Sequence, residues 1–274
     1  MPYPSTVSER VLNDLGIGSK EDLSLLEEIA WARGVLVKDD LLEGAEARLV
    51  VGRGSGIITV STTVENPRRR RFSIAHELGH FEMHRFKKAL SICLEDDIND
   101  GIHISAESEI FENEANEFAS AFLLPERFFA GLCRDVEPSF DHIAELSDDF
   151  DVSLTATALR YLFFCNEPLA IVFSQNNRIR WFQGSKDFEE IREDLGFFID
   201  VRSSLDPSAR AALFFQGRSV PPKARNVDAA AWFTPGRYHH GATIKEQSIA
   251  MPSHNSVLTL LWIDEEIDED DDYP

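Results

Sequence analysis

The residues best able to do chemistry form the pattern His76-Glu77-Leu78-Gly79-His80. On a helix, a four-residue offset is a rise of about 6 Å and a rotation of about 40°, so both imidazoles leave one face. Two such histidines predict two ligands for one Zn²⁺ ion. Glu77 then lies beside the metal, where a carboxylate can take a proton from water. The alternative is a surface helix whose two histidines are hydrogen-bonded and bind no metal. The helical context and the preceding strand favour the metal site.

A catalytic zinc needs a third protein ligand and an open fourth position. His84 continues the spacing, but three histidines four residues apart on a straight helix span about 12 Å, too far to meet one ion. We therefore expect His84 behind the ligands or at the edge of the core.

The second helix, about residues 106–124, offers several carboxylates. Measured as rotation about the helix axis from Phe111, Glu112 lies at about 100° and Glu114 at about −60°. This rotation predicts Glu112 on the more buried side, and an isolated buried carboxylate is costly unless it is paired or bound to a metal. Glu112 is thus the expected third ligand, with Glu114 as the alternative.

Two blocks of sequence carry a resemblance to a known family. They are residues 71–80, RFSIAHELGH, and residues 112–125, which begin Glu112-Asn113-Glu114-Ala115-Asn116 and end Leu123-Leu124-Pro125. Together they resemble the ImmA/IrrE-type metallopeptidases over roughly residues 20–165. The resemblance implies that His76, His80 and Glu112 hold zinc and that Glu77 is the general base. We expect His84 and Asn116 to lie behind these ligands.

The resemblance also implies a partner and a role. Family members typically cut a helix-turn-helix repressor, which releases genes for mobile-element transfer, the DNA-damage response or phage defence. The chain would then be a regulatory peptidase rather than a digestive one.

Cys93 lies in the loop between the two metal-binding helices, 13 residues after His80. A thiolate is an excellent zinc ligand and would displace the catalytic water, so Cys93 is a candidate inhibitory fourth ligand. The alternative, a buried loop cysteine, stays open.

Three further features have two interpretations each. The run Arg68 to Arg71 either contacts phosphate or, as is more common, pairs with carboxylates. The strand at residues 57–63 either receives an extended substrate by β-addition or is an ordinary strand of the sheet. The residue that stabilises the oxyanion stays open among Tyr161, His84 and His103.

The elements that must position these residues follow from periodicity and turn residues. We expect an amphipathic helix from Ser19 to Gly34 with Asp22 in a capping box. Hairpins are predicted at residues 47–51 with 57–63 and at residues 169–174 with 178–182. Helices are predicted over residues 70–86, 106–124 and 138–164.

These elements predict an α+β fold. A helical metallopeptidase domain with a small antiparallel sheet occupies residues 1–130, followed by a helix-turn-helix-like segment at 131–166 packed on it. A mixed α/β C-terminal domain occupies 167–263, and an acidic tail occupies 264–274. The C-terminal domain either senses a small molecule or single-stranded nucleic acid on exposed aromatics, or serves packing or dimerisation.

Composition excludes several classes of protein. Among 274 residues, 43% hydrophobic and 27% charged side chains are typical of globular proteins. The formal net charge is −21, with eight acidic residues between Asp264 and Asp272, which disfavours duplex DNA and anionic membranes as partners. Three cysteines without CxxC spacing, and no signal-peptide pattern, indicate a cytoplasmic protein.

The interpretation that combines these features is a regulatory zinc metalloendopeptidase. The main alternative is a latent or non-catalytic zinc protein that regulates a partner by binding. A direct DNA-binding regulator is a third hypothesis, which the acidic charge disfavours.

Overall fold

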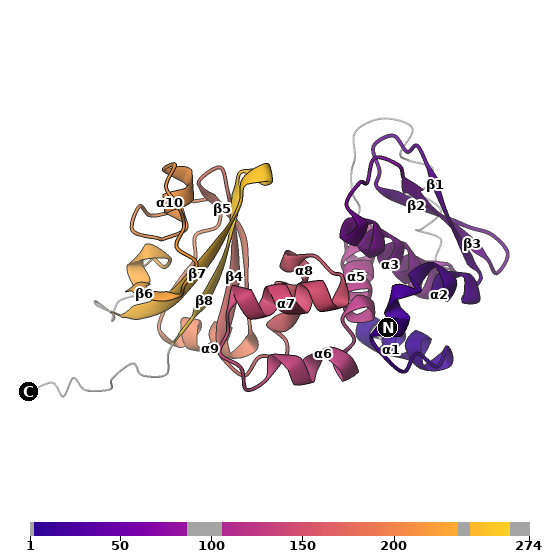
Figure 1. Cartoon of the computed structure of the whole chain (residues 1–274), viewed down its shortest axis with the longest axis horizontal. Coiled ribbons are helices and arrows are strands. Elements are labelled where there is room, and N and C mark those ends of the chain that lie inside the picture. Colours follow the sequence, from indigo (N-terminus) through magenta and orange to yellow (C-terminus); the bar gives the residue numbers. More distant parts are fainter. Residues whose placement is uncertain (1–2, 87–105, 235–241, 264–274) are drawn as a thin grey trace, which may run out of the picture. The chain divides into compact units, whose positions relative to one another are not determined.

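The computed structural model describes residues 3–86, 106–234 and 242–263 (Figure 1). They divide into two compact units. The N-terminal unit comprises residues 1–129 and 147–156, and the C-terminal unit comprises residues 130–146 and 157–274. Cys93, His103 and the acidic tail lie outside the described residues.

The N-terminal sheet has three strands, β1 (Val35–Asp40), β2 (Ala47–Val51) and β3 (Gly56–Ser61), in the order β1-β3-β2. The predicted hairpin of β2 and β3 is confirmed, but the sheet is mixed rather than antiparallel, because β1 pairs parallel with β3. The chain reverses direction between β1 and β2 and again between β2 and β3, so β1 and β3 run the same way. The prediction missed β1, whose acidic second half lacks the apolar pattern of a strand.

The predicted helix from Ser19 is divided in two. A 3₁₀ turn, η1 (Glu21–Ser24), is followed by α2 (Leu26–Ala32), with Leu25 outside helical geometry at φ −89° and ψ 43°. Part of the predicted capping box is present, since Asp22 accepts the Ser19 N–H at 3.0 Å. The structure adds α1 (Pro4–Asp14), which the sequence analysis did not predict.

Two long helices, α3 (Pro67–His84) and α5 (Ala106–Leu123), follow the predicted pattern. Asn66 caps α3 by accepting the Arg69 N–H at 3.1 Å, and Pro67 begins the helix, where its missing N–H has no intrahelical partner to lose. The predicted apolar stripes are buried: Ile74, Leu78 and Phe81 on α3, and Phe111, Ala115, Phe118 and Phe122 on α5.

A glycine sets the contact between these helices. A Cβ atom added at Gly79 would lie 2.9 Å from the Phe118 Cδ1 atom, closer than carbon atoms pack. Only glycine lets α5 approach α3 this closely at the centre of the histidine motif.

The arginine run is paired with carboxylates, which confirms the more common of its two interpretations. Arg68 donates to Asp148 at 2.6 Å, and Arg70 donates to Glu27 at 2.6 Å. The other partners are Glu46 for Arg69, Asp39 for Arg70, and Asp151 for Arg68 and Arg71. These pairs tie the beginning of α3 to the rest of the N-terminal unit.

Three shorter helices follow α5: α6 (Glu126–Cys133), α7 (Phe140–Phe150) and α8 (Leu154–Tyr161). Asp151 turns the chain between α7 and α8 with φ 52°. The helix-turn-helix-like segment contributes residues to both units, and its acidic turn supplies the partners of Arg68 and Arg71.

The C-terminal unit has a five-stranded antiparallel sheet in the order β5-β4-β8-β7-β6. Its strands are β4 (Leu169–Gln175), β5 (Arg178–Gly184), β6 (Arg225–Asp228), β7 (Thr243–Met251) and β8 (Ser256–Trp262), with helices α9 (Lys186–Asp194) and α10 (Ala212–Phe215). The predicted hairpin of β4 and β5 is confirmed, and Asn176 and Asn177 turn it with φ 53° and 60°. The whole chain is therefore α+β.

The aromatic residues of this unit serve largely as core. Trp232 and Trp262 are buried, together with Phe188, Phe197 and Phe233.

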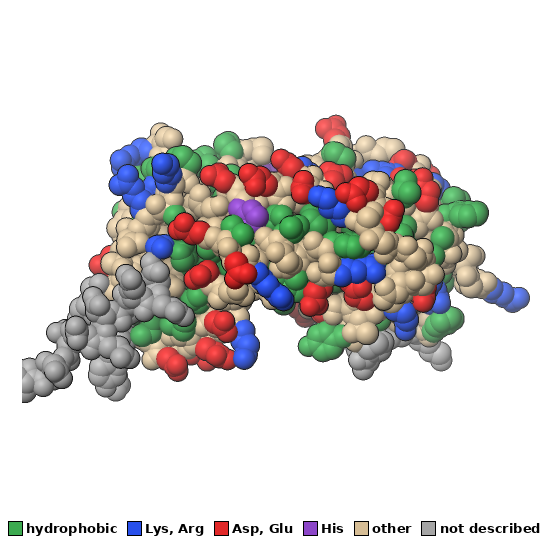
Figure 2. Space-filling view, turned by 60° about the horizontal axis from the view of Figure 1, so that its bottom comes forward, with side chains coloured by type: hydrophobic (Ala, Val, Ile, Leu, Met, Phe, Trp, Pro, Cys, Tyr) green, Lys and Arg blue, Asp and Glu red, His purple; other side chains and the backbone are tan. Residues whose placement is uncertain are grey.

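On the face shown in Figure 2, acidic and basic side chains are interspersed. No helix in the described part of the chain combines the length and apolar character needed to cross a bilayer.

Candidate metal centre

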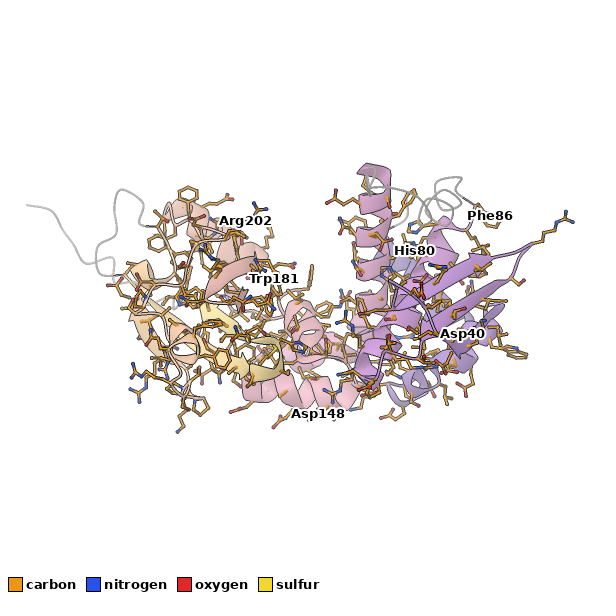
Figure 3. The ribbon with its side chains drawn as sticks, turned by 90° about the horizontal axis from the view of Figure 1, so that it is seen from above. Asp40, His80, Phe86, Asp148, Trp181 and Arg202 are labelled. Atoms are coloured by element: carbon orange, nitrogen blue, oxygen red, sulfur yellow. The ribbon has the colours of Figure 1, made fainter. Side chains whose placement is uncertain are left out.

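His76 and His80 project from one face of α3, as the four-residue spacing predicts. Their Nε2 atoms lie 3.1 Å apart, and their rings meet edge to face with centroids 4.7 Å apart. One turn of helix therefore directs two imidazole nitrogens at the same point. Figure 3 marks His80 on this helix.

Glu112 approaches that point from α5. Its carboxylate oxygens lie 3.2 Å from His76 Nε2 and 3.3 Å from His80 Nε2. The three ligand atoms all lie within 4.8 Å of one another, and this is the only such group of three among the residues that the structure describes. The close packing of Phe118 on Gly79 brings α5 near enough for this contact.

One premise behind the choice of Glu112 was wrong. The rotation predicted Glu112 on the more buried side of α5, but its side chain is 53% exposed and that of Glu114 is 17% exposed. The buried face of α5 follows Phe111, Ala115 and Phe118. Glu112 lies beside this face, over the histidines, where solvent can reach it.

The charges of this cluster reinforce one another. Hydrogen bonds from His76 and His80 hold the pKa of the Glu112 carboxyl far below its usual range. Burial lowers the pKa of His76, but the hydrogen bond to Glu112 and the charge of Glu77 outweigh it and raise that pKa overall. The site thus favours a carboxylate facing positive charge.

The ligand set fits a divalent cation. Asn116 Oδ1 lies 3.0 Å from His76 Nδ1, so a neutral His76 donates this N–H and carries a lone pair on Nε2. That lone pair converges with His80 Nε2 and a carboxylate, an arrangement that a positive charge at the centre would stabilise. Two imidazole nitrogens and one carboxylate oxygen are ligands that zinc prefers.

Glu77 lies next to His76 on α3, and its carboxyl accepts a hydrogen bond from the Leu49 backbone N–H. Burial raises the pKa of Glu77 above its usual range. The contact with β2 brings the edge of the sheet next to the candidate general base.

The strand predicted to receive substrate is in the wrong place for that role. β3 is the central strand, hydrogen-bonded to β1 on one side and β2 on the other, so it has no free edge. Among the described residues, the strand beside α3 that is paired on one side only is β2, which the sequence analysis treated only as half of a hairpin.

The remaining candidate residues, His84 and Tyr161, lie in different units. His84 is fully buried and contacts His80, and its Nε2 atom lies 2.8 Å from the Glu114 carboxylate. Tyr161 is buried in the C-terminal unit with its ring against His142. The contact of Glu114 with His84 was not predicted, although the spacing of His80 and His84 placed His84 one helical turn beyond the second ligand.

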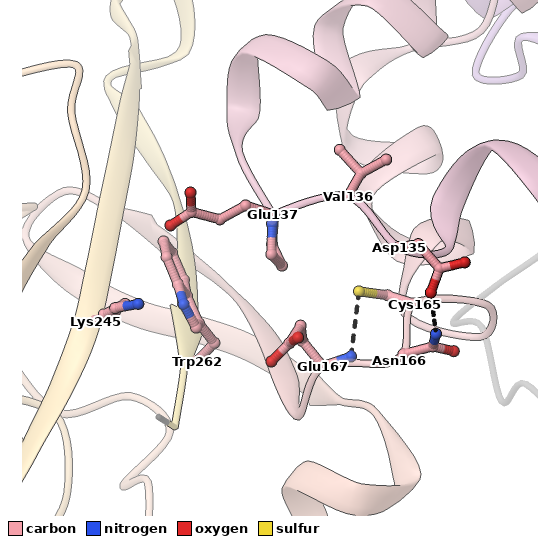
Figure 4. Close-up of a pocket in the computed structure, with 9 residues that line it drawn as sticks. Asp135, Val136, Glu137, Cys165, Asn166, Glu167, Lys245 and Trp262 are labelled. Atoms are coloured by element: carbon pink, nitrogen blue, oxygen red, sulfur yellow. Dashed lines mark hydrogen bonds between the residues drawn. The ribbon is translucent and has the colours of Figure 1, made fainter. Parts of the chain in front are cut away.

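A pocket in the C-terminal unit has a volume of about 360 Å³ (Figure 4). Its lining includes Asp135, Glu137, Glu167, Lys245 and Trp262. The Lys245 ammonium lies 5.8 Å from the centre of the Trp262 ring. None of these side chains joins a metal-binding group among the described residues.

Comparison with known proteins gives a family match that covers the metal centre. Residues 33–161 match the IrrE N-terminal-like domain. The radiation response metalloprotease IrrE of Deinococcus radiodurans is 28% identical over 122 residues, which are 43% of this chain and 34% of that protein. The matched region thus spans about a third of that relative.

A solved structure extends the likeness in fold. A Mycobacterium tuberculosis transcriptional regulator superposes with a TM-score of 0.58 at 20% identity, covering 95% of this chain and 75% of that one. At this identity the likeness shows a shared fold.

Proposed function

We propose that this protein is a zinc-dependent endopeptidase that cleaves a specific protein, because residues 33–161 match the IrrE N-terminal-like domain. The observation that carries the proposal is the convergence of His76, His80 and Glu112 within 4.8 Å, with Glu77 next to His76 on the same helix. This is the set of groups that a hydrolytic metal site requires.

His76, His80 and Glu112 would hold the metal, which when bound supplies a Lewis acid that acidifies water and polarises the scissile carbonyl. Glu77 takes the proton from the attacking water and delivers it to the leaving amine.

The free edge of β2 is the proposed binding strand for the substrate. The Ser61 N–H donates to the Glu46 carbonyl across the hairpin, and the alternation of an antiparallel ladder then turns the backbone groups of Leu49 away from β3. The Leu49 N–H indeed meets Glu77. Because Glu77 already accepts from the Leu49 N–H, an extended peptide would pair with the remaining outward groups of β2, beside the general base.

The proposed substrate is a helix-turn-helix transcriptional repressor, and the proposed role is to switch on a stress, DNA-damage or phage-defence response. The relative from Deinococcus radiodurans is a radiation response metalloprotease, which supports a regulatory role.

The test compares new protein N-termini in cells that express wild type or Glu77→Gln, with and without DNA damage. Gln keeps the size of the side chain but cannot accept the proton, so we expect zinc content to stay near one per chain and cleavage to fall by about 100-fold or more. A regulator cut only by wild type supports the peptidase and identifies its substrate.

Equal N-termini in all four samples would contradict the peptidase and favour a zinc protein that acts by binding. Cys93→Ala is then the informative variant. Cleavage that appears only in Cys93→Ala would indicate that Cys93 keeps the enzyme latent.

A further inference from the structure

A line of polar contacts runs from Glu114 to the metal centre through His84. Glu114 Oε2 lies 2.8 Å from His84 Nε2, and His84 Nδ1 lies 3.0 Å from His80 Nδ1. His84 is fully buried, and its ring stacks on Phe111 with centroids 4.6 Å apart. The orientation of its two nitrogens is therefore held from both sides.

The chemistry of each group sets the direction of these hydrogen bonds. A carboxylate only accepts, so His84 Nε2 carries a proton and donates it to Glu114. The neutral His84 ring then has its lone pair on Nδ1, which accepts from His80 Nδ1–H. His80 is left with its lone pair on Nε2, the atom that faces His76 and Glu112.

We propose that Glu114, acting through His84, holds His80 in the tautomer that can ligate the metal. Glu114 is thus a positioning residue rather than a ligand, and the inference rests on the metal site of the proposed function. Such groups behind a histidine ligand orient its ring and raise its basicity.

For a neutral His84, the reverse direction of these hydrogen bonds is unfavourable at both ends. If the neutral ring donated from Nδ1 to His80, its Nε2 lone pair would face the Glu114 carboxylate at 2.8 Å. His80 would then point an N–H at the centre of the site, where it could not bind a cation.

Residues 111–116 of α5, fewer than two helical turns, carry the whole arrangement. Phe111 stacks on His84, Glu112 faces the two Nε2 atoms, and Glu114 accepts from His84. On the other ligand, Asn116 Oδ1 accepts from His76 Nδ1 at 3.0 Å and selects the same tautomer. Both histidines thus present Nε2, each through a different acceptor on the same helix.

The experiment measures the Zn²⁺ dissociation constant of the full chain by competition with a chelator. His84→Leu removes both hydrogen bonds, and we expect zinc affinity to fall by about 10- to 100-fold. His84→Gln offers a carbonyl to His80 and an amide N–H to Glu114, so we expect it to recover most of that loss. Glu114→Ala should resemble His84→Leu, and Glu109→Ala, which removes an exposed carboxylate of the same helix, is the matched control.

A second readout tests the tautomer directly. In zinc-loaded wild type, imidazole ¹⁵N NMR should show His80 protonated on Nδ1 and ligated through Nε2. His84→Leu should lose the slow exchange of that Nδ1–H, which a variant that only loosens packing elsewhere would keep.

The outcomes separate this inference from the proposed function. Zinc affinity within about twofold of wild type in both His84→Leu and Glu114→Ala would overturn the role of Glu114 and His84, and so would ligation by His80 through Nδ1. Neither result would contradict the metal site itself. A wild-type protein that binds no zinc would overturn both the proposed function and the role of Glu114 and His84.

Discussion

Glu112 in the N-terminal unit and Glu246 in the C-terminal unit are both carboxylates inside a ring of close polar neighbours. Glu246 is fully buried and accepts four hydrogen bonds, from the backbone N–H groups of Arg210 and Ala211, the Trp232 indole and the Ser248 hydroxyl. Glu112 is half exposed and faces two imidazole nitrogens instead.

The difference between them lies in what their neighbours offer. Every neighbour of Glu246 is a donor, so the protein itself satisfies the charge, and the carboxylate ties the loop before α10 to β7. His76 and His80 offer lone pairs on Nε2 when they are neutral, and lone pairs do not satisfy a carboxylate. A positive charge satisfies it, either on protonated imidazoles or from a cation between the three groups, so the comparison separates a structural acid from an acid placed to face a cation.

Glu112→Ala should have the largest effect and should act on function alone. Removing one of three ligands should take zinc content close to zero and lower cleavage by at least about 100-fold. Because Glu112 is exposed, unfolding of the metal-free protein should change by less than about 0.5 kcal/mol. Metal analysis and chemical denaturation check both halves, with Glu109→Ala as control. Full zinc content in Glu112→Ala would remove the distinction from Glu246.

Glu246→Leu should show the opposite pattern. It removes the acceptor of the Arg210 and Ala211 backbone N–H groups and of the Trp232 indole, whereas the Ser248 hydroxyl keeps Thr259 as a partner. At about 1–3 kcal/mol for each group left unpaired, the free energy of unfolding should fall by about 3 kcal/mol or more. Zinc affinity should stay unchanged. Hydrogen exchange at the Ala211 amide and the Trp232 indole reports this directly, and unchanged protection of both would argue against the structural role.

Gly79→Ala should have the smallest effect of the three variants. It should lower both stability and zinc affinity, whereas each of the other two changes one of them. Its Cβ would press on Phe118, at a cost of about 1–3 kcal/mol, and should move α5 with Glu112 away from the histidines. We therefore expect lower stability and weaker zinc binding together. Gly131→Ala, which meets no atom within 4 Å on α6, should be neutral or stabilising by up to about 1 kcal/mol. Equal behaviour of the two variants would show that the contact of α3 with α5 does not set the site.

The parts of the fold that could be predicted depend on neighbours in the chain. The stripe of Ile74, Leu78 and Phe81 follows the period of a helix, and Asn176-Asn177 tolerates the left-handed conformation that a tight hairpin needs. His76 and His80 meet because a helix always brings residues four apart onto one face. The parallel pairing of β1 with β3 depends on contacts distant in the chain and could not be predicted in this way.

The chain's local pattern predicts which residues could bind a metal and move a proton: two histidines one helical turn apart, a glutamate beside them and a carboxylate on a second helix. How these residues meet depends on packing between distant parts of the chain. The tertiary structure placed Glu112 over the histidines and Glu114 behind them, made β2 rather than β3 the free edge, and aligned Glu114 and His84 behind His80. The physical reason is that the backbone sets angles within a helix, whereas the distance between helices depends on packing, here on the contact of Gly79 with Phe118.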